Sequence, residues 1–229
     1  YLKGYRGFDV EAAFDAIEKS LTGTFPKQRK NDWAVYNKYG YLPLDIVKGE
    51  SVSRVLEYAM DDDCAARMAK AMGKKEAEAF FAKRAQNYRN VFDPETKFMR
   101  GKDSKGNWRT PFDPFMLGHG AGTPNDFTEG NSWQYTWHVQ QAPDALIALM
   151  GGKKAFADKL DSLFTAPSTV AGQGFVLDVS GLVGQYAHGN EPSHHVAYLF
   201  PFADRGWRTQ ELIREICDRF YVNRPDGLC

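Results

Sequence analysis

The sequence lacks the net charge that a charged partner would need. Its 229 residues include 29 Lys and Arg and 29 Asp and Glu, so the formal charge at pH 7 is +0. Proteins that bind nucleic acid usually concentrate basic residues in a patch, and apolar runs of about 20 residues mark membrane spans. The sequence shows neither feature. We therefore expect no nucleic-acid partner and no membrane span.

Cysteine is scarce, and the ends of the chain are unusual. The three cysteines, Cys64, Cys217 and Cys229, lie far apart and match neither a zinc-binding spacing nor a disulfide framework. We expect buried or incidental thiols.

The chain starts at Tyr1 rather than Met, and neither end resembles a natural terminus. We expect a piece of a longer protein, with the remainder of the parent chain as its partner.

Apolar and aromatic residues are plentiful, and they recur with the period of a helix. Hydrophobic residues make up 43% of the chain and aromatic residues 14%, enough for a core and a lined cavity. Helical spacing predicts helices over residues 10–21, 51–72, 75–91, 132–150 with an interruption at Pro143, 153–164, 192–202 and 207–222. Asp9 is a candidate N-cap, while Gly23 and Gly73 are expected to end helices.

Between the helices lies a long irregular stretch, residues 93–126, in which we expect only a short hairpin of residues 98–100 with 108–110. Such stretches inside helical domains are more often functional than idle. Paired helices with long loops predict an all-α fold, a closed α/α toroid or an arc of one. Toroids of this kind gather loops and aromatic rings around a central pit that holds sugars.

The first chemical motif is residues 127–137. Glu129 lies just before an expected helix, whose dipole would favour its charge. One interpretation is a capping carboxylate. The other is a sugar site, because Trp133, Tyr135 and Trp137 follow and a flat ring stacks on the face of a sugar.

The second motif, residues 186–198, combines an amide, a carboxylate, imidazoles and phenols around Gly189 and Pro192. It predicts a polar pocket floor. His194 and His195 have a structural interpretation, as histidines bonded to backbone or carboxylates. A zinc site is disfavoured because the spacing of His188, His194 and His195 is not that of a zinc-binding helix. The oxygens of Asn190 and Glu191 suit calcium better.

Two further segments have simpler alternatives. At residues 49–58, Glu50 is a candidate helix cap, and Ser53 or Arg54 is a candidate to reach the pit. The alternative there is a helix start with local ion pairs. The run at residues 118–122 contains glycine and His119, but it lacks the Lys and Ser or Thr of a phosphate-binding loop.

Several segments together resemble the calcium-dependent exo-α-mannosidases of glycoside hydrolase family 92. They are KGY at 3–5, GYLP at 40–43, EYA at 57–59, RAQNY at 84–88, FDPET at 92–96, EGNSWQY at 129–135 and GQYAHGNEPSHH at 184–195. The resemblance covers essentially the full length, and the last motif is its most specific part.

The resemblance implies hydrolysis of terminal α-mannosides in glycans with inversion, in an (α/α)6 catalytic domain that follows a β-sandwich. It implies that Glu129 is the general acid, with Glu191 as the alternative acid and otherwise a sugar contact. It also implies calcium, with Asn190, Glu191 and Gln134 as candidate ligands. The implied substrate contacts are Trp133, lining the pit, and His188, on the leaving-group side, where it favours α-1,2 linkages.

The chain also departs from the family pattern. After the counterpart of Leu228 and Cys229, the family continues into a motif that supplies the catalytic base, and here residues 138–144 replace a Pro-His-Asp step. We expect residues 1–229 to be part of one α/α-toroid catalytic domain, without its β-sandwich and C-terminal continuation, and inactive alone. We also expect a periplasmic or secreted protein. The alternative function is a non-catalytic toroid that binds glycans.

Overall fold

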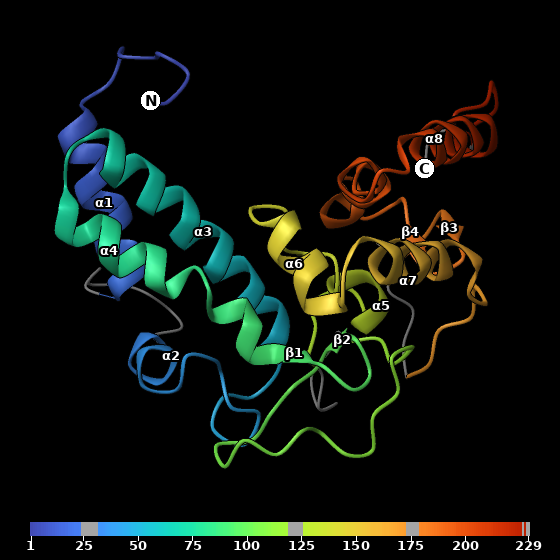
Figure 1. Ribbon diagram of the computed structural model, residues 1–229, viewed down its shortest axis with the longest axis horizontal. Helices are drawn as coiled ribbons and strands as arrows, with labels where there is room; N and C mark the ends of the chain where they lie inside the picture. The colour runs from blue at the N-terminus through green and yellow to red at the C-terminus, as the bar shows by residue number, and fades with distance from the viewer. Residues whose placement is uncertain (24–31, 119–125, 173–178, 226, 228–229) are drawn as a thin grey trace. The chain divides into compact units, whose positions relative to one another are not determined.

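The computed structural model describes residues 1–23, 32–118, 126–172, 179–225 and 227 (Figure 1). It divides into two compact units, residues 1–91 with 101–108 and residues 92–100 with 109–229, each described by itself below. The prediction of an all-α protein is confirmed, because helices dominate and each named strand has two residues. Across the described ranges, no helix combines the length and apolar content needed to cross a membrane.

The first unit is built around one long helix. Its helices are α1 (Val10–Thr22), α2 (Trp33–Tyr39), α3 (Ser51–Ala71), α4 (Lys75–Arg84) and the 3-10 helix η1 (Asn87–Val91). The long helix α3 packs against both α1 and α4 (Figure 1). The core side of α3 carries side chains that are fully buried: Val52, Val55, Leu56 and Ala59. The spacing that predicted the helix therefore also builds the core.

The ends of these helices follow signals in the sequence. Asp9 accepts a hydrogen bond from the backbone N–H of Ala12 at 3.0 Å and caps α1 as predicted. Gly23 follows α1 with φ of 74°, a left-handed conformation open to glycine without a steric penalty. Gly73, with φ of 73°, lies between α3 and α4, so the expected helical hairpin is present.

Two parts of the first unit differ from expectation. Helix α2 was not predicted, since its 7 residues are too few to show a clear helical period. The helix expected over residues 75–91 ends as an α-helix at Arg84 and continues as η1. There the side-chain amide of Asn90 donates to the carbonyl oxygen of Gly40 at 2.8 Å, a side chain to backbone bond of the kind that competes with a regular helix.

The second unit has shorter helices and two antiparallel hairpins. Its α-helices are α5 (Ser132–Tyr135), α6 (Pro143–Met150), α7 (Lys153–Thr165) and α8 (Gly206–Phe220). The hairpins pair β1 (Phe92–Asp93) with β2 (Phe98–Met99), and β3 (Leu182–Val183) with β4 (Tyr186–Ala187). Helices α6, α7 and α8 each bury apolar side chains, among them Leu146, Phe156, Leu160, Leu212 and Ile216, and α6 packs against α7.

The expected pairing of residues 98–100 with 108–110 was wrong. Phe98 lies opposite Asp93, and Trp108 forms only an isolated bridge with Lys102. The carboxylate of Asp93 accepts hydrogen bonds from Glu95 N and Thr96 Oγ1, both at 2.9 Å. These bonds close the turn after β1 and so direct the chain back onto β1.

The helix expected over residues 192–202 was also wrong. The segment consists of three 3-10 helices, η2 (Glu191–Ser193), η3 (Val196–Tyr198) and η4 (Phe200–Ala203). Pro201 has no N–H to donate in a longer α-helix, and its ring clashes with the preceding turn. The interruption near Pro143 is longer than expected, because α5 ends at Tyr135 and α6 begins at Pro143 itself.

Candidate functional site

The loop before α5 places Glu129 in a left-handed backbone conformation, with φ of 47°. The N-cap of α5 is Asn131, whose side chain accepts a hydrogen bond from Gln134 N, while the Gln134 side chain accepts one from Asn131 N. This reciprocal arrangement is a capping box. The capping role suggested for Glu129 therefore belongs to Asn131, and the carboxylate of Glu129 is left for another use.

A direct hydrogen bond joins the two motifs singled out in the sequence. The side-chain amide Nδ2 of Asn190 donates to the backbone carbonyl oxygen of Glu129 at 2.9 Å. Asn190 is buried, with 5% of its surface exposed, and follows the β3–β4 hairpin. Residues 61 positions apart in the sequence thus meet at one point of the second unit.

A small cavity lies at this meeting point. Its volume is about 10 Å³, and its walls come from α5 and its approach and from the segment around η2: Glu129, Gln134, Tyr135, His138, Asn190, Pro192 and Ser193. That volume suits one water-sized occupant. A sugar ring is larger, so a sugar bound here would lie over the cavity rather than inside it.

The two candidate acids differ in their surroundings. Glu129 is half-buried and lines the cavity, while Glu191 is exposed and is not among the described lining residues. Within the described part of the chain, neither carboxylate has a hydrogen-bond or ion-pair partner. An unpaired, half-buried carboxylate beside a polar cavity is chemically available, and this distinguishes Glu129 from the paired acids of the surface.

The candidate calcium ligands are oxygen donors, but one of them is already engaged. Gln134 accepts from Asn131 N at 3.0 Å and donates from Nε2 to the Gln185 carbonyl at 3.2 Å. No described residue donates to Asn190 Oδ1, which leaves that oxygen open. Amide and carboxylate oxygens are of the type that calcium prefers. The described residues contain no cluster of three or more His, Cys, Asp or Glu suited to a metal.

Trp133 lies in an aromatic cluster separate from the cavity lining. Its ring packs edge-on against Phe98 at 4.7 Å, and the Lys159 ammonium lies 4.5 Å from the centre of the Trp133 ring and 3.3 Å from that of Phe98. Burial lowers the pKa of Lys159 to about 8.

Trp137 is fully buried against Phe156, so the expectation that it stacks on a sugar was wrong.

His188 is held on both sides by tyrosines. Its Nδ1 lies 3.0 Å from the Tyr186 hydroxyl and its Nε2 lies 2.8 Å from the Tyr221 hydroxyl. The ring also stacks on His194 at 4.9 Å. Burial, and then the charge of His194, hold the pKa of His188 below its ordinary value. His188 is half-buried and lies outside the described cavity lining.

The structural interpretation of the other histidines is supported. His194 Nε2 lies 2.9 Å from the carbonyl oxygen of His188, and His195 Nε2 lies 2.9 Å from that of Trp137.

At the start of α3, Glu50 makes no side-chain cap, and Arg54 forms an ion pair with Asp32. Asp32 is distant in the sequence, so this ion pair is not the local one expected at the start of the helix. His119 and Cys229 lie outside the described residues, whereas Cys64 and Cys217 are exposed rather than buried.

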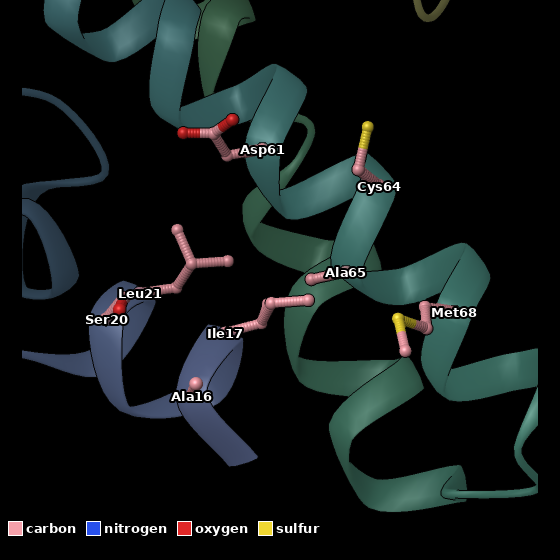
Figure 2. A pocket seen from close by; sticks show the side chains of 8 residues that line it. All are labelled: Ala16, Ile17, Ser20, Leu21, Asp61, Cys64, Ala65 and Met68. Carbon is pink, nitrogen blue, oxygen red and sulfur yellow. The ribbon is translucent and has the colours of Figure 1, made fainter. Parts of the chain in front are cut away.

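A larger groove lies in the first unit, between α1 and α3, with a volume of about 460 Å³. Figure 2 shows Ile17 of α1 directed toward Ala65 of α3, with Met68 further along the groove. The lining is mostly apolar, and Asp61 is its only carboxylate among the described residues. It offers no pair of acids and no amide cluster, so the small polar cavity of the second unit is the better candidate site.

The family follows from comparison with known proteins. The sequence profile of the glycosyl hydrolase family 92 catalytic domain matches residues 1–229. The chain belongs to glycosyl hydrolase family 92. A solved family 92 α-mannosidase from Bacteroides thetaiotaomicron, in complex with mannoimidazole, is 43% identical, with a TM-score of 0.85 over 97% of this chain. An inverting family 92 mannosidase from the same bacterium is 36% identical, with a TM-score of 0.82 over 100% of the chain.

A curated relative from the fungus Arthroderma benhamiae carries the name "uncharacterized secreted glycosidase" and is 26% identical over 86% of this chain. The chain spans 27% of the length of that protein, and 29% and 31% of the two bacterial mannosidases. The likeness confirms the family 92 fold assignment. That this chain forms an incomplete (α/α)6 toroid of helical hairpins, as part of a longer domain, stays a prediction.

Not every residue at the site was expected to line it. His138, Pro192 and Ser193 line the cavity; the last two lie within the motif at 184–195 but were not expected to be site residues, and His138 lies outside the quoted motifs. Asn131 and Gln185, both fully buried, hold the walls together through an amide hydrogen bond of 2.9 Å. Asn131 was detectable, since an Asn followed three residues later by Gln is a capping-box pattern. Gln185 lies within the motif at 184–195, but no sequence pattern indicates its bond to Asn131.

Proposed function

We propose that this chain is part of a family 92 catalytic domain that removes terminal α-linked mannose from glycans with inversion. One observation carries the proposal: the hydrogen bond from Asn190 to the Glu129 backbone brings both family motifs to one cavity, beside a carboxylate without a described partner. The relatives named as α-mannosidases, one of them an inverting enzyme, support the substrate class and the stereochemistry.

In the proposed reaction, Glu129 acts as the general acid. It donates its proton to the glycosidic oxygen as the bond from that oxygen to the anomeric carbon breaks. A water molecule attacks the anomeric carbon from the opposite face and gives its proton to a second carboxylate, about 6.5–9.5 Å from the first. We propose that this base comes from the parent protein outside the 229 residues. Glu129 is favoured over Glu191 because it is half-buried at the cavity.

The remaining candidate residues have proposed binding roles. Glu191, exposed beside the cavity, is placed to contact the sugar or a cation. The partly exposed rings of Trp133 and His188 would meet substrate only outside the cavity, with His188 toward the leaving group. These assignments follow the family motif, and the engaged nitrogens of His188 favour a positioning contact over proton transfer.

Calcium fits the chemistry of the oxygen donors, though the described residues supply few of them. We propose that Asn190 Oδ1 and the Glu191 carboxylate hold the ion, with Gln134 contributing through the second lone pair of its engaged oxygen. When bound, such an ion supplies a Lewis-acid contact to sugar hydroxyls and a template for the ring. We also propose a secreted or periplasmic location, and the name of the fungal relative supports secretion.

Substrates with different leaving groups test the function in the full-length parent protein. General acid catalysis contributes about 10²- to 10⁴-fold, and a good leaving group needs it least. We expect Glu129→Gln to lose that factor on a mannobiose and far less on an aryl α-mannoside with an acidic phenol, while still binding mannose. Glu191→Gln, the matched control, should weaken substrate or calcium binding with similar losses on both substrates.

The other outcomes of this experiment are equally informative. If the leaving-group dependence appears in Glu191→Gln instead, the two acids exchange roles. If both variants cleave mannosides as the unmodified protein does, the glycosidase assignment of this site fails. A parent protein that binds mannose but cleaves no mannoside would be the non-catalytic glycan-binding toroid.

A further inference from the structure

Gln185 is a fully buried amide with every hydrogen-bonding group in use. It lies in the turn between β3 and β4, and none of its surface is exposed. Its Oε1 accepts from Asn131 Nδ2 at 2.9 Å, and its Nε2 donates to the carbonyl oxygens of Pro167 and Thr169 at 2.5 and 2.8 Å. Its backbone oxygen accepts from Gln134 Nε2 at 3.2 Å, and its backbone N–H donates to Leu163 at 2.8 Å.

These bonds join three segments of the second unit that are distant in sequence. Asn131, itself fully buried, caps α5 and lies two residues after Glu129. The carbonyls of Pro167 and Thr169 belong to the loop that follows α7. The hairpin that contains Gln185 continues to Asn190, which returns to bond the Glu129 backbone. The loop carrying Glu129 is therefore tied to the hairpin segment at two points, the Glu129 carbonyl and the Asn131 side chain.

The backbone of Glu129 needs such support. A residue other than glycine in the left-handed region, here at φ of 47°, is strained and keeps this conformation where its surroundings fix it. Two of its supports are the bond from Asn190 and the Asn131–Gln185 bond. Of these two, the second joins side chains with no exposed surface.

We infer that Gln185 is a positioning residue, which fixes the Glu129 carboxylate against the Asn190 segment through Asn131. The inference rests on the proposed function, in which Glu129 is the acid. An amide is required at this place because one atom must accept from Asn131 while the other donates to two carbonyls. A carboxylate would repel the two carbonyls, and an alkyl group would take this partner from the buried amide of Asn131 and from both loop carbonyls.

The leaving-group experiment in the full-length parent protein also tests this inference. A misplacement of about 1 Å can cost as much as about 10²-fold in rate. We expect Gln185→Leu to lower kcat about 10- to 100-fold on a mannobiose with little change in KM. On an aryl α-mannoside with an acidic phenol the loss should shrink, as it does for Glu129→Gln. Loss of folded protein would lower both rates equally, so the ratio of the two rates identifies positioning.

Two further variants complete the design. Gln185→Glu keeps the shape of the side chain but replaces its donors with an oxygen that repels the two carbonyls, and it provides the same readout if Gln185→Leu does not fold. Asn90→Leu is the matched control, because it removes an amide bond to the Gly40 backbone in the other unit. It should lower stability while leaving kcat and the ratio of rates unchanged.

The outcomes separate the two proposals. Glu129→Gln without leaving-group dependence overturns the proposed function. The positioning role alone is overturned if Glu129→Gln shows this dependence but the Gln185 variants do not. In that case the Gln185 variants lose activity equally on both substrates or not at all. A lower ratio of rates in both Gln185 variants and an unchanged ratio in Asn90→Leu supports the positioning role.

Discussion

At the scale of single residues, Lys159 is a charge held in an apolar place. Its ammonium lies over the rings of Phe98 and Trp133, at 3.3 and 4.5 Å from their centres, and no described carboxylate forms an ion pair with it. Burial lowers its pKa from 10.5 to about 8. A cation over an aromatic face gains about 0.5–1 kcal/mol at exposed sites and more when desolvated, so the two effects oppose each other.

We predict that burial outweighs the ring contacts, so that Lys159→Met raises the melting temperature at pH 7. The unfolded chain binds more protons than the folded one between pH 8 and 10.5, so stability rises with pH in that window. Below about pH 8 the cost of the buried charge is fully present. The advantage of methionine should therefore be largest near neutrality and disappear toward pH 10.5. Calorimetry of the full-length parent protein at several pH values measures it.

Lys154→Met, on the same helix at an exposed position, is the control and should change the melting temperature little at any pH. An advantage of Lys159→Met that is independent of pH would show that packing rather than charge is responsible. A lower melting temperature at neutral pH would show that the ring contacts dominate.

Single residues also show where sequence reasoning succeeded. Glu129 and Asn190 were both singled out from their motifs, because each motif combined groups that neither a core nor a plain loop requires, and the structure joins the two residues by a hydrogen bond. A capping role was considered for Glu129, but the N-cap of α5 is Asn131, two residues later. The sequence alone does not show at which residue the backbone becomes helical. The burial of Trp137 was not foreseen, because an aromatic run does not show which rings face the core.

At the scale of elements, the β3–β4 hairpin depends on a glycine. Gly184 has φ of 61°, and a Cβ atom there would lie 2.3 Å from the carbonyl oxygen of Leu163 and 2.5 Å from the carbonyl carbon of Phe164. Both atoms are backbone at the end of α7, so neither can move aside easily. The hairpin therefore approaches α7 more closely than any side chain allows.

We predict that Gly184→Ala destabilises the protein by more than the roughly 1–2 kcal/mol expected for a left-handed alanine. The additional cost comes from pushing the hairpin off α7, which also displaces Gln185. Gly73→Ala is the matched control, since its φ of 73° is similar and nothing lies within 4 Å of the added Cβ. Denaturant unfolding of the full-length parent compares the two. Equal losses of unfolding free energy would contradict the close approach.

Helical elements were predictable where the period was long and uninterrupted. Helices α1, α3, α7 and α8 lie close to their expected ranges, because each buries an apolar stripe. The segment of η2 to η4 has helical spacing but contains two prolines, and its short 3-10 helices cannot be distinguished from one α-helix by spacing alone. The β1–β2 pairing was missed because the hydrogen bonds of Asp93 set it.

At the scale of the whole molecule, the chain accounts for 29% of the length of the family 92 mannosidase solved with mannoimidazole. We propose that residues 1–229 form part of one α/α-toroid catalytic domain. Their described residues form two compact units, and the candidate acid lies in the second. A complete inverting site needs a second carboxylate and walls for the sugar.

We predict that the 229-residue chain alone does not turn over an aryl α-mannoside, even with calcium. The acid would be present, but no base would activate water on the opposite face of the sugar. The assay compares the chain with the full-length parent at equal concentration, after circular dichroism has shown that the chain is helical. Turnover equal to that of the parent would show that these residues contain the base as well.

The bond from Asn190 to the backbone of Glu129 has a consequence for how such genes diverge. The two partners are far apart in the sequence, so a recombination breakpoint between them would combine an acid loop and a hairpin that arose in different ancestors. Chimeric mannosidases with crossovers in that interval should therefore fail more often than those with crossovers outside it.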